Sequence, residues 1–273
     1  AVAEEPAVAT YVVLSLVPAL GLALYVYRAD VTSGEPLRYL VATFLLGFAL
    51  AGFAAVLNSA FSGLLDVGLP LAAFFFLVVA PVEETVKLLA VRLYAYRAPA
   101  FDAVVDGAVY GAMAGLGFAA VENTVYITDQ YVVALEAAGT PLDETAFTAA
   151  VRSFAGPGHV IYSAFAGYYL GLAKFNPGDR GPIVVKGLVV AAAIHGLYNS
   201  LVSNLFEVAA ALGLGGVPPG ALFVGFVLAF DGAFGYVLYR KLRAYRRTYL
   251  AVGAGPRSQP DRVERDEFVW DRS

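Results

Sequence analysis

Pro81-Val82-Glu83-Glu84-Thr85-Val86-Lys87 lies inside a long apolar run that extends from Leu69 to Tyr96. Two carboxylates and a lysine therefore fall near the middle of a segment that is long enough to cross a lipid bilayer. A charged side chain at the centre of a membrane costs about 2.5–3.5 kcal/mol on insertion scales, so such side chains face a partner or a wet cavity. The stretch predicts a membrane-spanning helix whose charged residues meet polar groups of other helices.

The composition of the whole chain agrees with a membrane protein. Hydrophobic residues make up 59% of the 273 positions, which is more than a soluble domain of this length needs. Cysteine is absent, which excludes disulfides and thiolate metal sites within this sequence. The formal net charge of −4 is modest and gives no indication of a nucleic-acid partner. We therefore expect a multi-pass protein of the cell membrane, surrounded by the lipid bilayer.

Seven apolar segments are each close to the ~20 residues that a helix needs to cross ~30 Å of hydrocarbon. They are residues 7–27, 37–57, 70–95, 101–127, 150–175, 183–206 and 220–240. The third to fifth are longer, which predicts tilt or extension beyond the membrane. The expected fold is an all-α, polytopic bundle of about seven transmembrane helices within residues 1–247. The charged residues 248–273 lack apolar periodicity and are expected to form a disordered cytoplasmic tail.

The positions of lysine and arginine predict the orientation of this bundle. The loops 58–69, 128–149 and 207–219 contain no Lys or Arg, and Arg152 is the only basic residue near them. The alternate loops and the segment after residue 240 are basic. Because cytoplasmic loops carry the excess of Lys and Arg, we expect the N-terminus outside and the C-terminus in the cytoplasm. The first segment is expected to be a retained helix, since no basic region precedes it.

Polar residues also occur in the fourth and sixth segments. Glu122-Asn123 closes the apolar run of the fourth segment, where the simpler interpretation is a helix end that meets water. His195 and Asn199 lie four residues apart in the sixth, so they share one helix face. A single buried histidine is more often a hydrogen-bonded core residue than a ligand. The carboxylates in the same bundle nevertheless favour a common site.

The fifth segment contains the second of the two histidines of the chain. Gly156-Pro157-Gly158 directly precedes His159, and we expect it to break or bend the helix there. The backbone groups that such a break frees are tolerated in a membrane only against protein or water. His159 is therefore expected to border a polar cavity.

Other features favour structural roles. Gly107, Gly111 and Gly115 recur every four residues and predict a surface on which another helix packs closely. Asn58, at the outer end of the second segment, is interpreted as an interfacial cap. Asp231 is the only acidic residue inside the seventh segment and either pairs with Lys87 or is protonated.

The polar residues of successive segments fall at similar depths, so they can surround one cavity. Two histidines with two or three glutamates suit a divalent cation that holds water or hydroxide as the nucleophile. Without a metal, a glutamate could activate water as a general base. Both alternatives lead to hydrolysis.

Together these residues resemble the motifs of PrsW-type intramembrane proteases, which are distantly related to the CAAX prenyl-protein and bacteriocin-processing proteases. The motifs are Glu83-Glu84-x-x-Lys87, Gly-Leu-Gly-Phe118-x-x-x-Glu122-Asn123, His159 and His195-x-x-x-Asn199. In the related families an arginine stands one residue after the position of Lys87, and a histidine stands in place of Glu122. Both departures are the PrsW form. The resemblance covers about residues 75–200, within a motif core of residues 70–206.

The resemblance implies a protease that cleaves membrane-anchored proteins, such as anti-sigma factors, on the external side. Its cofactor would be a divalent metal, expected to be zinc, although a metal-free glutamate mechanism is also argued for the wider group. The implied residues are Glu83, Glu84 and Asn199 as catalytic residues, Glu122, His159 and His195 as metal ligands, and Lys87 and Asn123 as supporting residues. Which of Glu83 and Glu84 is the base stays open, and Asn199 would either orient His195 or donate to the oxyanion.

Two other functions fit charged residues inside a membrane. A proton- or ion-coupled transporter uses such residues, but transporters often contain inverted repeats. No second copy of the Glu83-to-Lys87 or Glu122-Asn123 motif occurs in this chain. An assembly scaffold would only pair its charges, whereas the carboxylates here outnumber Lys87. The sequence carries no indication of the oligomeric state.

Overall fold

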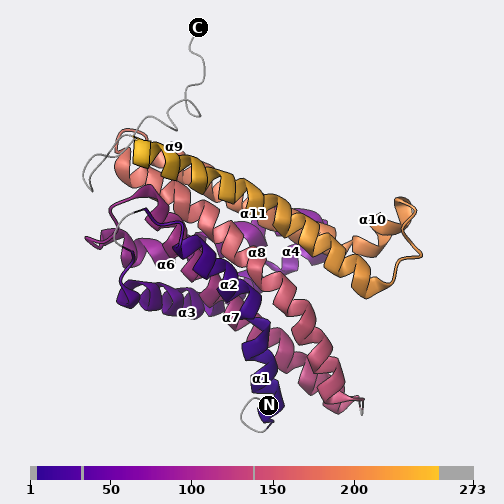
Figure 1. The fold of residues 1–273 in the computed structure, drawn as a ribbon. Helices are drawn as coiled ribbons and strands as arrows, with labels where there is room; N and C mark the ends of the chain where they lie inside the picture. The colour runs from indigo at the N-terminus through magenta and orange to yellow at the C-terminus, as the bar shows by residue number, and fades with distance from the viewer. Residues whose placement is uncertain (1–4, 32–33, 138, 252–273) are drawn as a thin grey trace.

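The computed structural model describes residues 5–31, 34–137 and 139–251. These residues are predominantly helical and contain no strand, which confirms the all-α class. Figure 1 shows them as one helical bundle. In chain order the helices are α1 (Pro6–Ser15), α2 (Val17–Tyr27), α3 (Leu37–Phe61), α4 (Gly63–Asp66), α5 (Leu71–Phe74), the π-helical turn η1 (Phe75–Val79), α6 (Ala80–Leu93), the 3₁₀ turn η2 (Ala95–Arg97), α7 (Val104–Glu136), α8 (Pro141–Phe175), α9 (Arg180–Ser203), α10 (Leu205–Ala211) and α11 (Pro219–Ala251).

Five helical segments of the described chain are long and apolar enough to cross a membrane. They are Pro6–Tyr27, Leu37–Asp66, Val104–Glu136, Arg180–Ser203 and Pro219–Ala251. They agree with a multi-pass membrane protein. The predicted third and fifth segments are not among them, because η1 divides residues 71–93 and because the uncharged stretch 153–173 of α8 contains many Gly, Ser, Tyr, Pro and His residues, which lower its mean hydropathy. These two segments contain the charged motif and His159, so the number of seven spans stays a prediction.

The centre of the bundle is α7, the most buried of the five candidate spans. A Cβ atom added to Gly107, Gly111 or Gly115 would collide with backbone carbonyl groups of α8. On the other side of α7, Gly117 and Gly47 make equally close backbone contacts between α7 and α3. The predicted packing surface is therefore confirmed, and close approach of α7 to α8 brings the two helices that carry Glu122 and His159 side by side.

Gly111→Ala is expected to lower the free energy of unfolding by about 1–3 kcal/mol, the usual effect of overpacking a close-packed interior. The added methyl group would meet the backbone carbonyl of Ser163, which cannot move without shifting α8. Thermal unfolding of the purified protein in detergent measures the effect. Gly225→Ala in α11 is the matched control, because nothing lies within 4 Å of its added Cβ. Equal unfolding temperatures for the two variants would contradict the packing argument.

Of the break or bend expected before His159, the break does not occur. Helix α8 continues from Pro141 to Phe175 with Pro157 inside it. Proline removes one backbone hydrogen bond of the helix, and the flanking glycines leave room for neighbouring side chains. A Cβ on Gly156 would lie 3.3 Å from the Cβ of Ala19, and one on Gly158 would lie 2.6 Å from the hydroxyl of Tyr162.

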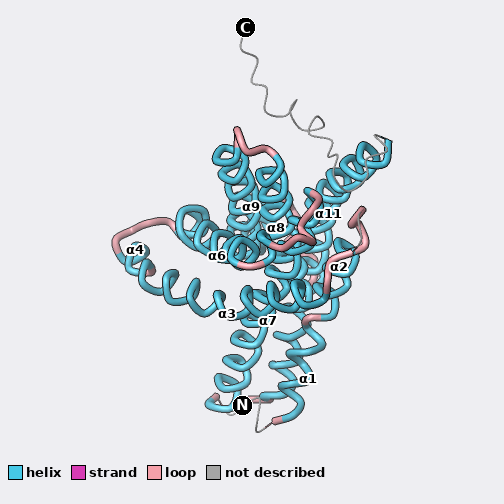
Figure 2. Tube along the Cα trace, turned by 90° about the vertical axis from the view of Figure 1, so that its left-hand side faces the viewer, coloured by secondary structure: helices cyan, strands magenta, loops and turns pink. Residues whose placement is uncertain are grey.

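Most of the predicted external loop 128–149 is also helical. Helix α7 extends to Glu136 and α8 begins at Pro141, so only residues 137–140 connect them. In Figure 1 this end of α7 and α8 projects from the bottom of the bundle together with α1, and Figure 2 shows the same projection from the side. The sequence predicted tilt or extension of the fourth span. Helix α7 has 33 residues, more than the ~20 that cross a membrane, which agrees with this prediction.

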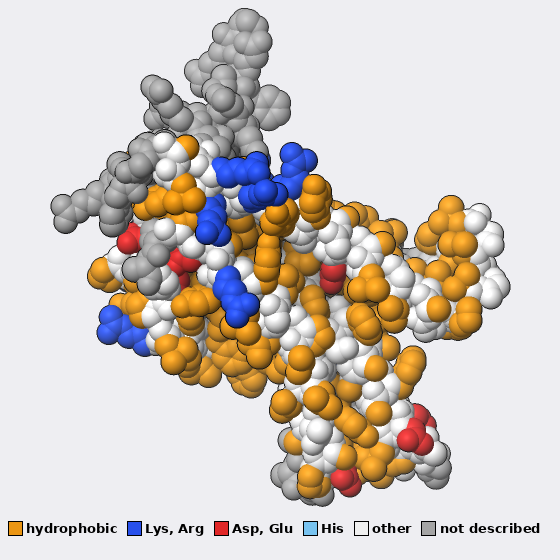
Figure 3. All heavy atoms as spheres, in the orientation of Figure 1, with side chains coloured by type: hydrophobic (Ala, Val, Ile, Leu, Met, Phe, Trp, Pro, Cys, Tyr) orange, Lys and Arg blue, Asp and Glu red, His pale blue; other side chains and the backbone are white. Residues whose placement is uncertain are grey.

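Charged side chains are distributed unevenly along the molecule. On the face in Figure 3, Lys and Arg gather in the upper half, whereas the lower projection displays acidic residues and no Lys or Arg. This distribution agrees with a cytoplasmic upper end, but the orientation stays a prediction. The predicted cytoplasmic tail lies almost entirely in residues 252–273, outside the described residues.

Cysteine labelling tests the orientation without background labelling of native thiols, since the chain has no cysteine of its own. Cysteines that replace Gly139 and Gly216 are expected to react with an impermeant thiol reagent added outside intact cells. A cysteine that replaces Ser258 should stay unlabelled until the membrane is permeabilised. The reverse pattern would contradict the orientation inferred from Lys and Arg.

Candidate active site

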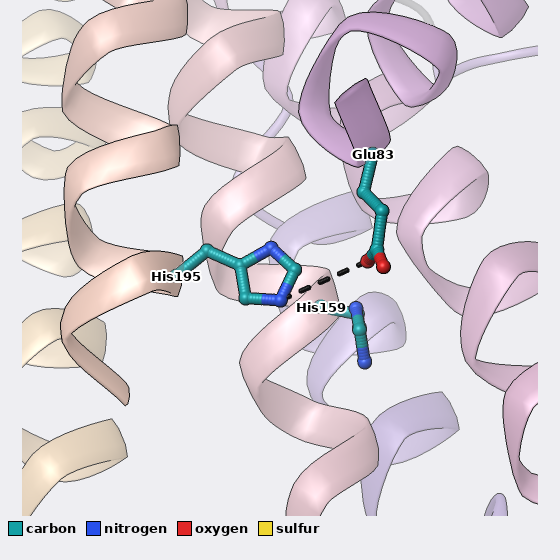
Figure 4. A group of neighbouring side chains, drawn as sticks. All are labelled: Glu83, His159 and His195. Carbon is teal, nitrogen blue, oxygen red and sulfur yellow. Dashed lines mark ion pairs between the residues drawn. The ribbon is translucent and has the colours of Figure 1, made fainter. Parts of the chain in front are cut away.

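Helices α6, α8 and α9 bring Glu83, His159 and His195 together inside the bundle (Figure 4). One ligand-type atom of each residue lies within 4.8 Å of those of the other two. All three residues are buried, with exposed fractions of 5%, 6% and 3%. His195 Nε2 lies 3.7 Å from Glu83 Oε2. Three of the predicted site residues, from distant parts of the sequence, thus meet at one point.

The local structure before α6 is unusual. Proline has no N–H, so Pro81 cannot donate the α-helical hydrogen bond to Leu77, and the chain forms the π-helical turn η1 just before it. Such π turns are rare in proteins overall, and those that occur are often found at functional sites. On α9, Gly196 allows close contact with this turn, because an added Cβ would lie 2.8 Å from the ring of Phe76. The turn and Gly196 together bring Glu83 and His195 to facing positions.

Glu84 holds the ring of His195. It is fully buried, and its Oε1 accepts a hydrogen bond from Lys87 Nζ at 2.7 Å. His195 Nδ1 lies 2.9 Å from the same oxygen. A carboxylate on Nδ1 favours the tautomer that carries its proton there, which leaves Nε2 as a lone-pair donor toward Glu83.

Lys87 links this carboxylate to the other histidine. Its Nζ lies 2.9 Å from His159 Nδ1 and 3.8 Å from Glu83 Oε2. Because an ammonium group can only donate, Nδ1 of His159 accepts and Nε2 carries the proton. The open question about Asp231 is answered in part, since Lys87 pairs with the two glutamates and both oxygens of Asp231 are buried without a hydrogen-bond partner.

Glu122 reaches the cluster through His159 and is not one of the three converging residues. Its Oε2 lies 2.9 Å from His159 Nε2 and 2.7 Å from a terminal nitrogen of Arg152. The Nε of Arg152 donates to Asn123 Oδ1 at 2.9 Å. Asn123 is fully buried and donates to Ser15 Oγ at 2.9 Å, so its side chain is fixed in position to accept the hydrogen bond from Arg152.

Three residues at the site, Asn58, Arg152 and Tyr162, were not identified as site residues from the sequence. Asn58 Nδ2 donates to Glu83 Oε1 at 3.1 Å, so the interpretation of Asn58 as an interfacial cap is wrong. Tyr162 stacks on His195, with ring centroids 5.2 Å apart and an angle of 22°, and its buried hydroxyl has no hydrogen-bond partner. The only sequence signal for Asn58 was a polar residue at the end of an apolar helix. The only signal for Tyr162 was its position one helical turn after His159.

The cluster lies at a cavity of about 730 Å³, within the range of roughly 300–1,000 Å³ typical of ligand sites. Glu83, Glu122, His159, His195 and Asn199 all line it. The walls are otherwise largely apolar, and they include Ala51, Ala55, Phe75, Val79, Phe118 and Val121. The cavity could therefore accommodate an apolar peptide beside the buried polar cluster.

Asn199 lines this cavity one helical turn after His195. No hydrogen bond joins the two side chains among the residues that the structure describes, and Glu84 already occupies Nδ1 of His195. Two roles were predicted for Asn199, to orient His195 or to donate to the oxyanion. Because Glu84 contacts Nδ1 of His195, Glu84 is the residue in place for the first role.

The charges of the site do not balance. Three carboxylates, Glu83, Glu84 and Glu122, face two cationic groups, Lys87 and Arg152. Glu83 Oε2 is buried and accepts no hydrogen bond. A buried carboxylate oxygen without a hydrogen bond is costly unless a proton, a cation or a substrate group meets it.

Residues 35–232 match the family model described as PrsW family intramembrane metalloprotease. The chain is 31% identical over 195 residues to the protein named Protease PrsW of Shouchella clausii (strain KSM-K16), covering 71% of this chain and 83% of that protein. It is 30% identical to Protease PrsW of Halalkalibacterium halodurans, over 68% of this chain and 80% of that one. The identity to Protease PrsW of Bacillus subtilis (strain 168) is 29%, over 70% and 81%. No solved structure gives a significant match.

Proposed function

The chain belongs to the PrsW family of intramembrane metalloproteases, and on this premise we propose that Glu83 is the reacting carboxylate of its peptide-bond hydrolysis, either as a ligand of the catalytic metal or, without a metal, as the general base. The observation that carries the proposal is the buried Oε2 of Glu83, which has no hydrogen-bond partner and faces two histidines at the edge of a cavity. Asn58 holds the other oxygen. Glu83 is thus fixed in position while one oxygen stays available.

The residues of the site fit a divalent cation. Two imidazoles and one carboxylate are a donor set of catalytic zinc sites, and Glu83, His159 and His195 would hold the ion. Binding by His159 requires one ring nitrogen to release its present partner, Lys87 or Glu122. When bound, the cation supplies a Lewis acid that polarises the scissile carbonyl and acidifies water.

The other polar residues position these groups. Glu84 keeps Nε2 of His195 turned toward Glu83, and Glu122 with Arg152 fixes the ring of His159. Lys87 offsets the charge of Glu84 and donates to His159. Asn199, on the cavity wall, is placed to donate a hydrogen bond to the oxygen on which negative charge develops during attack.

The substrates that we propose are membrane-anchored proteins, with anti-sigma factors as one class. The apolar cavity wall suits the side chains of a membrane segment, and Arg152 in the cavity lining suits the polar residues that follow such a segment. Incubation of the purified protein in liposomes with a panel of single-span membrane proteins tests the proposal. We expect at least one to be cut in or beside its span, with loss of cleavage in chelator and recovery on addition of Zn²⁺.

The chelator experiment separates the two mechanisms. If cleavage continued at the full rate in chelator, the mechanism would not need a metal. Glu83 would then be a general base that acts directly on water. Failure of a folded, metal-loaded protein to cut any single-span protein would contradict the proposed substrate class. Proton- or ion-dependent transport by the same liposomes would support the carrier alternative.

A further inference from the structure

A second group of carboxylates lies at the N-terminal end of α7, whereas Glu122 lies near the middle of this helix. It consists of Asp30 in the connection after α2, Glu35 before α3, and Asp106 in the first turn of α7. One carboxylate oxygen of each lies within 4.8 Å of those of the other two. Asp106 precedes Glu122 by 16 residues, which is about 24 Å at 1.5 Å per residue, so this group is separate from the active site.

Two of these side chains are more than nine-tenths buried, and only one oxygen of each carboxylate accepts a hydrogen bond. Asp106 is 0% and Glu35 is 4% exposed. Asp106 Oδ2 accepts hydrogen bonds from the backbone N–H groups of Asp102 and Ala103, and Glu35 Oε2 accepts one from Tyr110. The other oxygens, Glu35 Oε1 and Asp106 Oδ1, are buried without any hydrogen-bond partner. They are vacant acceptors within a cluster of negative charge.

Lys174 forms no ion pair with Glu35 or Asp106. The nearby ammonium group of Lys174 donates to the backbone carbonyls of Tyr96 and Phe101, at 2.8 and 2.7 Å. Within the described ranges, no Lys or Arg forms an ion pair with Glu35 or Asp106. Burial raises the pKa of Glu35 to about 7 against the opposing effect of the Tyr110 hydrogen bond, and the charges of Asp30 and Asp102 add to the rise.

We propose that Asp30, Glu35 and Asp106 form a second binding site, for a hard divalent cation such as Mg²⁺, Ca²⁺ or Mn²⁺. The donors are oxygens alone, with no imidazole, and this donor set selects hard cations over zinc. The site joins the connection between α2 and α3 to the start of α7. Its cation would fasten the end of the central helix that is remote from the active site, so its role is structural and does not depend on the hydrolytic mechanism.

The competing occupant is a proton shared between Glu35 and Asp106. Amide substitutions separate the two possibilities because they keep the existing hydrogen bonds. Glu35→Gln retains an acceptor for Tyr110, and Asp106→Asn retains one for the two backbone N–H groups. Each removes a negative charge that a cation needs, so each variant should fold without cation at least as stably as its parent.

The experiment uses the full chain in detergent, in a Glu83→Gln/His195→Ala background that removes the first site. Mn²⁺ is titrated and followed by electron paramagnetic resonance, and thermal unfolding is recorded with and without Mn²⁺. We expect saturable binding that Ca²⁺ or Mg²⁺ competes away, together with a higher unfolding temperature. Glu35→Gln and Asp106→Asn should each weaken binding by about tenfold or more and abolish the temperature increase. Asp66→Asn, an exposed acid in α4, is the control that should change nothing.

Absence of saturable Mn²⁺ binding in this background would overturn the proposal in favour of the shared proton. Unchanged binding in Glu35→Gln or in Asp106→Asn would overturn it as well, since the ions would then bind elsewhere. If one variant failed to fold, the other would still decide the question. The measurement does not require activity, so its failure is distinguishable from failure of the proposed catalytic mechanism.

Discussion

Glu83→Gln is expected to lower the rate of peptide-bond cleavage by a factor of about 10² or more, the usual contribution of a positioned acid–base group. The amide has nearly the same shape as the carboxylate and keeps an oxygen that can accept the hydrogen bond from Asn58. It provides neither the charge that a cation requires nor a basic oxygen that takes a proton from water. Initial rates of product formation, compared at equal amounts of folded protein, measure the loss.

Glu84→Gln serves as the comparison for this substitution. Glu84 neutralises Lys87, so its replacement leaves a buried ammonium group poorly paired, and the unfolding temperature should fall as well as the activity. Glu83→Gln should leave the unfolding temperature near that of the wild type. A Glu83→Gln variant that retained more than a tenth of the wild-type rate would contradict the assignment of Glu83 as the reacting carboxylate.

His195→Ala is expected to abolish cleavage and to release the metal. The substitution removes the ring whose Nε2 faces Glu83, and with it one of the three converging ligand-type atoms. Activity and the metal content per protein, measured by mass spectrometry after dialysis against a weak chelator, should fall together. Tyr162→Phe is the matched control for metal content, since it keeps the ring that stacks on His195 and removes only a hydroxyl.

The His195→Ala experiment has three outcomes, and each leads to a different conclusion. Loss of activity with loss of metal supports His195 as a ligand. An inactive variant that kept the wild-type metal content would exclude this role and would make His195 a group that positions Glu83 or the substrate. Wild-type activity in the variant would remove His195 from the site altogether.

The sequence predicted the fold class and the family from features that act locally. A charged motif within an apolar run, two histidines in apolar segments and a glycine repeat each restrict the structure without knowledge of the other helices. The glycine repeat of α7 was assigned correctly because close helix packing requires small residues at that spacing. Membership of the PrsW family, together with the lack of a repeated motif, disfavours the transporter alternative.

The contacts around the site could not be predicted in the same way, because they depend on how each helix is rotated about its axis. Asn58 reaches Glu83 from α3, and Arg152 reaches Glu122 from α8, at sequence separations that no local pattern reveals. The sequence predicted a break or a bend at Pro157, and the break is absent because α8 continues through this residue.

The most direct test of the account is the single-turnover cleavage of a substrate by the Glu83→Gln/Glu84→Gln double variant, in liposomes and with folding verified by its unfolding temperature. The account predicts no product above that formed without enzyme, because neither carboxylate would remain to activate water or to orient His195. Cleavage at the wild-type rate by the folded double variant would contradict it, and the intramembrane carboxylates would then have to serve a function other than hydrolysis.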